Sequence, residues 1–91
     1  MSHPDPAARV RAWLAQVLDR PPAALAALPA TTALFGPDLN LDSFSGMALL
    51  ALIQRDTGLD VAADDLGLAS LETLGTLAAY LQQHSSAAAT D

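Results

Sequence analysis

The clearest pattern in the sequence is a set of apolar residues that recur at helical spacing in three stretches of the chain. In the first stretch, Asp5 is placed as an N-cap and Pro6 takes the first helical position, where a missing N–H costs nothing. An apolar stripe at the spacing of one helix face follows: Val10, Trp13, Leu14, Val17 and Leu18. The pattern predicts a helix over residues 6–19 with Trp13 in the core.

A long connection separates this helix from the next. Pro21 and Pro22 stop the first helix, and Pro29, Gly36 and Pro37 interrupt any regular pattern up to residue 42. A structureless loop of that length is uncommon in a compact domain. We therefore expect residues 20–42 to include a helical turn over 23–28 and to be anchored by apolar side chains, namely Leu34, Phe35, Leu39 and Leu41.

The second stretch predicts a helix over residues 43–57, ended by Gly58. Its apolar residues fall on two sides of a helix. One side is expected to face the core and carries Leu49, Leu50, Leu52 and Ile53. The other side is expected to face outward and carries Phe44, Met47, Ala48, Ala51 and Arg55.

The C-terminal third predicts a short helix over residues 63–68, with Asp64 and Asp65 at its positive end, and a final helix capped by Ser70 or Thr73. The stripe of the final helix is Leu74, Leu77, Ala78 and Leu81, with Tyr80 beside it. We expect an ordered core over about residues 5–83, a frayed tail over 84–91, and a single domain over 1–91. The fold class is all-α, a small four-helix bundle of three main helices and one short helix.

Composition agrees with this fold and narrows the partners. The chain has 91 residues, with 20 alanines and 17 leucines against four valines and isoleucines together, and a net charge of −6. An acidic chain with four arginines and no lysine offers no cationic stripe for nucleic acid. No apolar run is long enough to span a membrane and no secretory signal is visible, so we expect a cytoplasmic protein. There is no cysteine, so any thiol chemistry must come from a cofactor.

Ser43 is the strongest candidate for a functional residue in the sequence. It lies at the start of a helix, after a long loop and beside Asp42, so an anion on its hydroxyl would meet unpaired N–H groups and the positive end of the helix dipole. The simpler alternative is that Asp42 or Ser43 is only an N-cap. His3 and His84 lie near the two ends without further ligands at metal spacing, so no metal site is expected. A hydrolase made of Ser43, His84 and Asp42 is disfavoured, because Asp42 adjoins the serine instead of orienting the histidine.

Three motifs together favour a modified Ser43 over a simple N-cap. Leu41-Asp42-Ser43-Phe44, the apolar helix ending in Thr57-Gly58-Leu59, and the closing Thr73-Leu74-Gly75 resemble, in order and spacing, the acyl and peptidyl carrier protein family. The resemblance implies that Ser43 receives 4′-phosphopantetheine from a phosphopantetheinyl transferase, which uses coenzyme A and Mg²⁺, with Asp42 in a supporting role. It implies a carrier and not an enzyme, loaded by an acyl- or aminoacyl-transferring enzyme and unloaded by a downstream synthase or transferase.

The sequence also departs from the usual pattern of that family. Phe44 stands where a leucine or methionine is common, and Ala48, Gln54 and Arg55 stand where acidic residues are common. We therefore expect an apolar partner face, assisted by Asp38, Asp42, Asp56 and the acids of 60–65, unless Phe44 folds back onto the core.

The type of cargo is left open by the motifs. Asp42-Ser43-Phe44 is similar to D-alanyl carrier proteins, whereas the alanine-rich composition and Thr57-Gly58-Leu59 look like carriers of polyketide pathways, including those of antibiotic biosynthesis. We favour a freestanding monomeric carrier in polyketide-type metabolism. The alternatives are an aminoacyl carrier, D-alanyl-like or peptidyl, and an unmodified helical interaction module.

Overall fold

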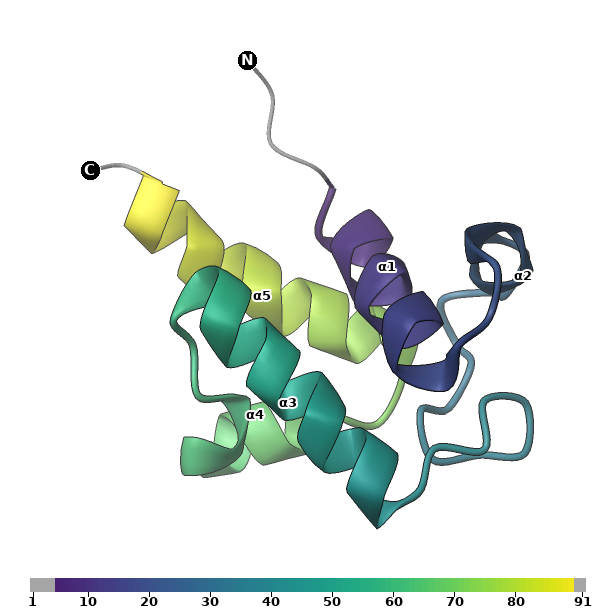
Figure 1. Cartoon of the computed structure of the whole chain (residues 1–91). Helices are drawn as coiled ribbons and strands as arrows, with labels where there is room; N and C mark the ends of the chain where they lie inside the picture. The colour runs from purple at the N-terminus through teal and green to yellow at the C-terminus, as the bar shows by residue number, and fades with distance from the viewer. Residues whose placement is uncertain (1–4, 90–91) are drawn as a thin grey trace.

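Every named element in the part of the chain that the structure describes is a helix or a helical turn. The computed structural model describes the backbone of residues 5–89 and the side chains of residues 5–84. Its elements are α1 (Pro6–Leu18), α2 (Pro22–Ala26), α3 (Ser43–Thr57), a 3₁₀ turn η1 (Val61–Ala63), α4 (Asp65–Ser70) and α5 (Leu74–Ala89) (Figure 1). Within residues 5–89 the only extended pairing is one isolated bridge between Ala33 and Thr73. The predicted all-α class is confirmed.

The two helices with the strongest patterns lie where the sequence predicts them. α3 has the predicted bounds, and its C-cap Gly58 adopts φ 79°, a left-handed conformation that glycine accepts at little cost. α1 begins at Pro6 with Asp5 at the N-cap position, as predicted, although the Asp5 side chain makes no capping hydrogen bond. The Asp5 carbonyl accepts the first helical hydrogen bond from the Arg9 N–H at 3.0 Å, and Pro6 has no N–H that needs a partner.

The boundaries in the C-terminal third differ from the prediction. In place of one helix over 63–68, the chain makes η1 and then α4, because the Asp64 side chain accepts a hydrogen bond from the Gly67 N–H and fixes the start of α4 at Asp65. α5 is capped by Thr73 and not by Ser70: the Thr73 hydroxyl accepts from the Thr76 N–H, and the Thr76 hydroxyl accepts from the Thr73 N–H.

The last helix also extends beyond the expected limit of the ordered core near residue 83. α5 runs to Ala89, through three alanines with high helix propensity and no breaker. Thr90 and Asp91, the end of the expected frayed tail, lie outside the described residues.

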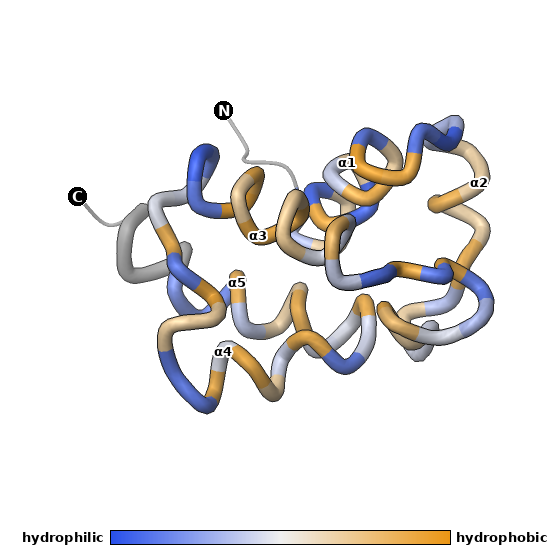
Figure 2. The backbone as a smooth tube through the Cα atoms, turned by 60° about the horizontal axis from the view of Figure 1, so that its bottom comes forward, coloured by the Kyte–Doolittle hydropathy of each residue, from blue (hydrophilic) through white to orange (hydrophobic). Residues whose placement is uncertain are grey.

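The core forms where α1 packs against α2, α3 and α5, while α4 packs against α5 and η1. Figure 2 shows hydrophobic positions along the helices and polar positions concentrated in the connections. Trp13 is 4% exposed, as predicted. On α3, Leu49 and Ile53 are buried, and Leu50 and Leu52 are half-buried against them. The predicted rotation of α3 about its axis is therefore confirmed.

The long connection is ordered by backbone pairing with the start of α5. Leu34 donates its N–H to the Glu72 carbonyl at 3.0 Å, and Gly75 donates to the Ala30 carbonyl at 2.8 Å. Leu34, Leu39 and Leu41 are buried as expected, but Phe35 is 54% exposed. Phe35 does not enter the core, because the bridge at Ala33 directs Leu34 inward and leaves its neighbour outside, but its ring lies against Gly46 of α3.

Candidate functional site

Ser43 is the first residue of α3, and its side chain is exposed. The preceding connection ends at Asp42, whose carbonyl accepts the first helical hydrogen bond from the Gly46 N–H at 2.8 Å. The Asp42 carboxylate accepts from the Ser45 N–H at 2.7 Å. The N–H groups of Ser43 and Phe44 form no full hydrogen bond in the described part of the chain, although the Phe44 N–H also helps to lower the pKa of the Asp42 carboxylate. Both groups lie at the positive end of the helix, where another acceptor can bind.

The charge of Asp42 is held in place by the same cap. Hydrogen bonds from Ser45, first from its backbone N–H, lower the pKa of Asp42 below the ordinary 3.8. The carboxylate is thus ionised at neutral pH and directed at the backbone of α3. Asp42 is both an N-cap and a neighbour of the exposed hydroxyl, so the two interpretations of this pair from the sequence are compatible.

The other serines with described side chains, Ser45 and Ser70, are less suited to modification. Ser45 is half-buried, and Ser70 is 6% exposed with its hydroxyl donating to the Gly67 carbonyl at 2.6 Å. The side chains of Ser85 and Ser86 and the whole of Ser2 lie outside the described residues. Among the serines with described side chains, Ser43 alone is exposed at the start of a helix. An exposed hydroxyl beside free N–H groups fits the attachment of a phosphate-linked arm.

The outward side of α3 next to Ser43 is apolar. Phe44 is 82% exposed and Met47 is 70% exposed, while Ala51 and Arg55 are exposed further along and Ala48 is half-buried. The alternative in which Phe44 folds onto the core is therefore wrong. We call Phe44, Met47, Ala48, Ala51 and Arg55 the α3 face.

One aromatic residue beside this face was not foreseen. The Phe35 ring, from the long connection, lies over Gly46, such that a Cβ on Gly46 would come within 3.2 Å of two ring carbons. Gly46 is buried by this contact although it lies in the first turns of α3. The signal in the sequence is a glycine inside a strongly helical pattern, which often marks a close approach by another group.

The acidic residue near the other end of α3 has a structural role that the sequence did not predict. Both carboxylate oxygens of Asp56 have intramolecular partners: Trp13 Nε1 donates at 2.7 Å and Arg55 Nε donates at 3.0 Å. These two hydrogen bonds, the one from Arg55 first, lower the pKa of Asp56. Asp56 therefore links α3 to α1 while remaining exposed, and its contribution of charge to a partner stays a prediction.

The other chemistries considered from the sequence gain no support. Among residues 5–84, no three histidine, aspartate or glutamate side chains lie close enough to hold a metal ion. His84 lies against the Tyr80 ring, with centroids 4.2 Å apart, while Asp42 is bound to Ser45. No hydrogen bond in the described part of the chain joins Ser43, His84 and Asp42 as a hydrolase would need.

Comparison with known proteins identifies the family to which the chain belongs. The family model described as the phosphopantetheine attachment site matches residues 8–81. Searches of curated proteins and of solved structures found no match. In the described part of the chain, no helix combines the length and apolar character that crossing a membrane requires. The match covers most of the chain, so the protein belongs to the phosphopantetheine attachment site family and is a non-catalytic carrier that bears 4′-phosphopantetheine on a serine.

Proposed function

We propose that Ser43 is the serine that carries the arm, and that the loaded carrier serves a polyketide-type pathway. The observation that carries the first part is that Ser43 combines an exposed hydroxyl with the unpaired N–H groups at the start of α3. A phosphodiester there keeps one negative charge, which the helix N-terminus stabilises. The protein itself contributes no acid, base or nucleophile to later steps.

Asp42 supports this site by fixing its geometry. Its carboxylate caps the Ser45 N–H and so holds the first turn of α3 in one conformation. The hydroxyl of Ser43 is then presented by a rigid helix at the end of an ordered connection. A modifying enzyme meets a preformed site and need not order it on binding.

Carrier proteins work with a phosphopantetheinyl transferase and with the enzymes of their pathway. We assign their contact surface to the α3 face. Phe44 and Met47 offer apolar area to a partner, and burial of such area stabilises a complex by about 25 cal/mol per Å². Arg55 remains largely exposed although it pairs with Asp56, and surface pairs of this kind are weak enough to exchange for a partner carboxylate.

The polyketide assignment is supported by the alanine-rich composition and the Thr57-Gly58-Leu59 turn. An aminoacyl cargo, D-alanyl-like or peptidyl, is the second candidate because of Asp42-Ser43-Phe44. An unmodified interaction module is disfavoured, because the family is defined by its attachment site. The thioester released from protein isolated from its own host distinguishes the candidates: an amino acid on the arm would refute the polyketide-type assignment.

Intact-mass measurement tests the attachment site. The chain is incubated with coenzyme A, Mg²⁺ and a broad-specificity phosphopantetheinyl transferase, and the expected result is one arm per chain. Ser43→Ala should remove the modification and leave the helical circular dichroism unchanged. Ser45→Ala is the matched control, two residues later on the same helix, and it should be modified like the parent. An arm on the Ser43→Ala protein would refute the assignment.

A further inference from the structure

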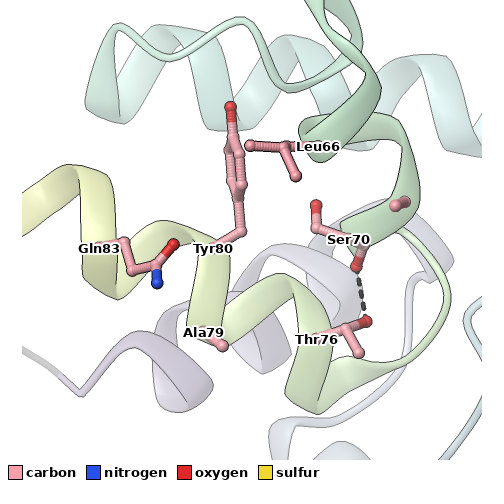
Figure 3. Close-up of a pocket in the computed structure, with 7 residues that line it drawn as sticks. Leu66, Ser70, Thr76, Ala79, Tyr80 and Gln83 are labelled. Atoms are coloured by element: carbon pink, nitrogen blue, oxygen red, sulfur yellow. Dashed lines mark hydrogen bonds between the residues drawn. The ribbon is translucent and has the colours of Figure 1, made fainter.

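An open groove lies between α4 and α5, and none of the residues that line it belongs to α3 or to the connection before it. It has a volume of about 310 Å³ and is lined by Leu66, Ala69, Ser70, Thr76, Ala79, Tyr80 and Gln83. Figure 3 shows the Tyr80 ring standing beside Leu66, with Ser70 and Thr76 joined at the other end of the groove. That joint is the hydrogen bond from the Thr76 hydroxyl to the Ser70 carbonyl, 2.7 Å long, which fixes α4 relative to α5.

Tyr80 gives the groove an unused polar group. Its side chain is 8% exposed, but its hydroxyl is not among the buried side-chain atoms that lack a partner, so the oxygen itself reaches solvent. The hydroxyl forms no hydrogen bond with a residue in the described range and is open to an acceptor on a partner. Burial, and then the charges of Asp64 and Asp60, raise the pKa of Tyr80, so the hydroxyl keeps its proton at neutral pH and is able to donate it to an acceptor.

The rim of the groove next to α4 is acidic and has no cation of its own. Asp60, Asp64 and Asp65 are exposed, and none of them forms an ion pair in the described part of the chain. The chain has four basic residues, all arginines, on α1, directly after it, and on α3. The negative charge beside the groove is therefore available to a basic partner.

The dimensions of the groove favour a protein partner over a small ligand. Its volume is at the low end of the range for ligand pockets, and it is open along one side, so it would bury only part of a small molecule. Leu66 is 75% exposed at its edge and is available to contact a larger surface. Two or three apolar side chains projecting from one helix face would fill the groove while cationic side chains of the same helix reach the acids.

We propose that the α4–α5 groove is a second docking surface, which binds a basic amphipathic helix of a partner protein. The helix places apolar residues between Leu66 and Ala79, gives a backbone or side-chain acceptor to the Tyr80 hydroxyl, and pairs its cations with Asp60 and Asp65. Binding here leaves the α3 face free, so a partner attached through the groove remains bound while Ser43 is modified.

Nuclear magnetic resonance with designed peptides tests the proposal. The ¹⁵N-labelled chain is titrated with two helical peptides of about 15 residues, one with leucine and lysine faces and one with leucine and glutamate faces. The leucine–lysine peptide should shift the amides of Leu66, Ala79 and Tyr80, and the leucine–glutamate peptide should bind more weakly. Absence of shifts at about 1 mM peptide, equal binding of the two peptides, or shifts confined to Phe44 and Met47 would each overturn the proposal.

Variants of the chain locate the contact. Ala79→Arg places a cation in the groove and should weaken binding of the leucine–lysine peptide at least about tenfold. Gln82→Arg is the matched control, because Gln82 is exposed on the same helix and does not line the groove, and it should keep most of the affinity. Equal losses in these two variants would indicate a general charge effect and overturn the proposal.

A double substitution tests the acidic rim. Asp60→Asn with Asp65→Asn should weaken binding about fivefold, as two exposed ion pairs would, and unchanged affinity would overturn the assignment of these acids. Asp64 is left intact because it caps α4.

The outcome is independent of the attachment site. Ala79→Arg should accept the arm on Ser43 at the parental rate, as measured by intact mass. If the peptide fails to map to the groove while Ser43 is modified, only the docking proposal fails. If the peptide maps to the groove and Ser43 is not modified, only the proposed attachment site fails.

Discussion

Met47→Glu should separate recognition from stability within α3. The Met47 side chain is 70% exposed, so replacing it with another exposed side chain should change the free energy of unfolding by no more than about 0.5 kcal/mol. Full burial of a methionine side chain stabilises by about 1.5–3 kcal/mol, so a partner that covers the exposed part gains about 1–2 kcal/mol. Losing this contact should lower kcat/KM of the phosphopantetheinyl transferase about five- to thirtyfold, and a carboxylate in the contact should lower it further.

Leu49, two residues later on the same helix, should affect stability strongly because it is buried. Leu49 is 1% exposed, and Leu49→Ala should cost about 2–5 kcal/mol, because it removes buried apolar volume. Leu49→Glu adds the cost of an unpaired buried charge, which is a large share of the stability of a domain of this size. We expect that variant to be unfolded.

Two measurements check this contrast. Urea unfolding followed by the fluorescence of Trp13, the single tryptophan, gives the stability of each variant, and intact mass over time gives kcat/KM. Ala12→Glu is the control, since it makes the same change of charge at an exposed position of α1. The reasoning is refuted if Met47→Glu costs several kcal/mol of stability, or if Ala12→Glu lowers kcat/KM as much as Met47→Glu does.

Three further predictions concern the packing and ionisation that support the site. Gly67→Ala should destabilise the domain by about 3 kcal/mol in urea unfolding, because its Cβ would collide with the carbonyl oxygen of Val61; a loss under 0.5 kcal/mol would refute this contact. Thr32→Val should be neutral or stabilise by up to about 1 kcal/mol, because the buried Thr32 hydroxyl has no partner in the described part of the chain, and a clear destabilisation would show that the hydroxyl is bonded. The lowered pKa of Asp56 means that its ionised form stabilises the fold above pH 3.8, and that this contribution is lost as the pH falls through the lowered pKa. The melting temperature of Asp56→Ala, measured between about pH 2 and pH 7, should therefore fall less steeply with decreasing pH than that of the parent.

The sequence was sufficient to predict the bounds and the buried side of α3, because every local signal there agrees. A cap at Asp42, an unbroken apolar run and a terminating Gly58 all specify the same helix, and the helical period alone separates Leu49 from Met47. The exposure of the α3 face followed from that period. The place of Ser43 at the first position of α3 was predictable for the same reason, because it depends on the start of one well-defined helix.

The features that the sequence did not reveal depend on contacts between distant parts of the chain. Asp56 looks like one surface acid among several, and only the packing of α1 against α3 brings Trp13 Nε1 to its carboxylate. The exposure of Phe35 likewise depends on the pairing of its connection with the start of α5. Neither partner is marked by spacing, because no period connects residues 43 positions apart.

The arrangement of α3 would allow one helix to support both the fold and the recognition of partners that we propose for the α3 face. Its hold on the core comes from Leu49 and Ile53, while its N-terminal turns expose Ser43, Phe44 and Met47. The buried residue among these first turns is Gly46, and it is covered by the exposed Phe35 ring of the preceding connection. The surface around Ser43 is therefore built partly by a loop that is fixed at its other end by α5. Substitutions on this surface can change which partner binds without removing a core contact, and a shift of the loop would reshape the surface without changing α3.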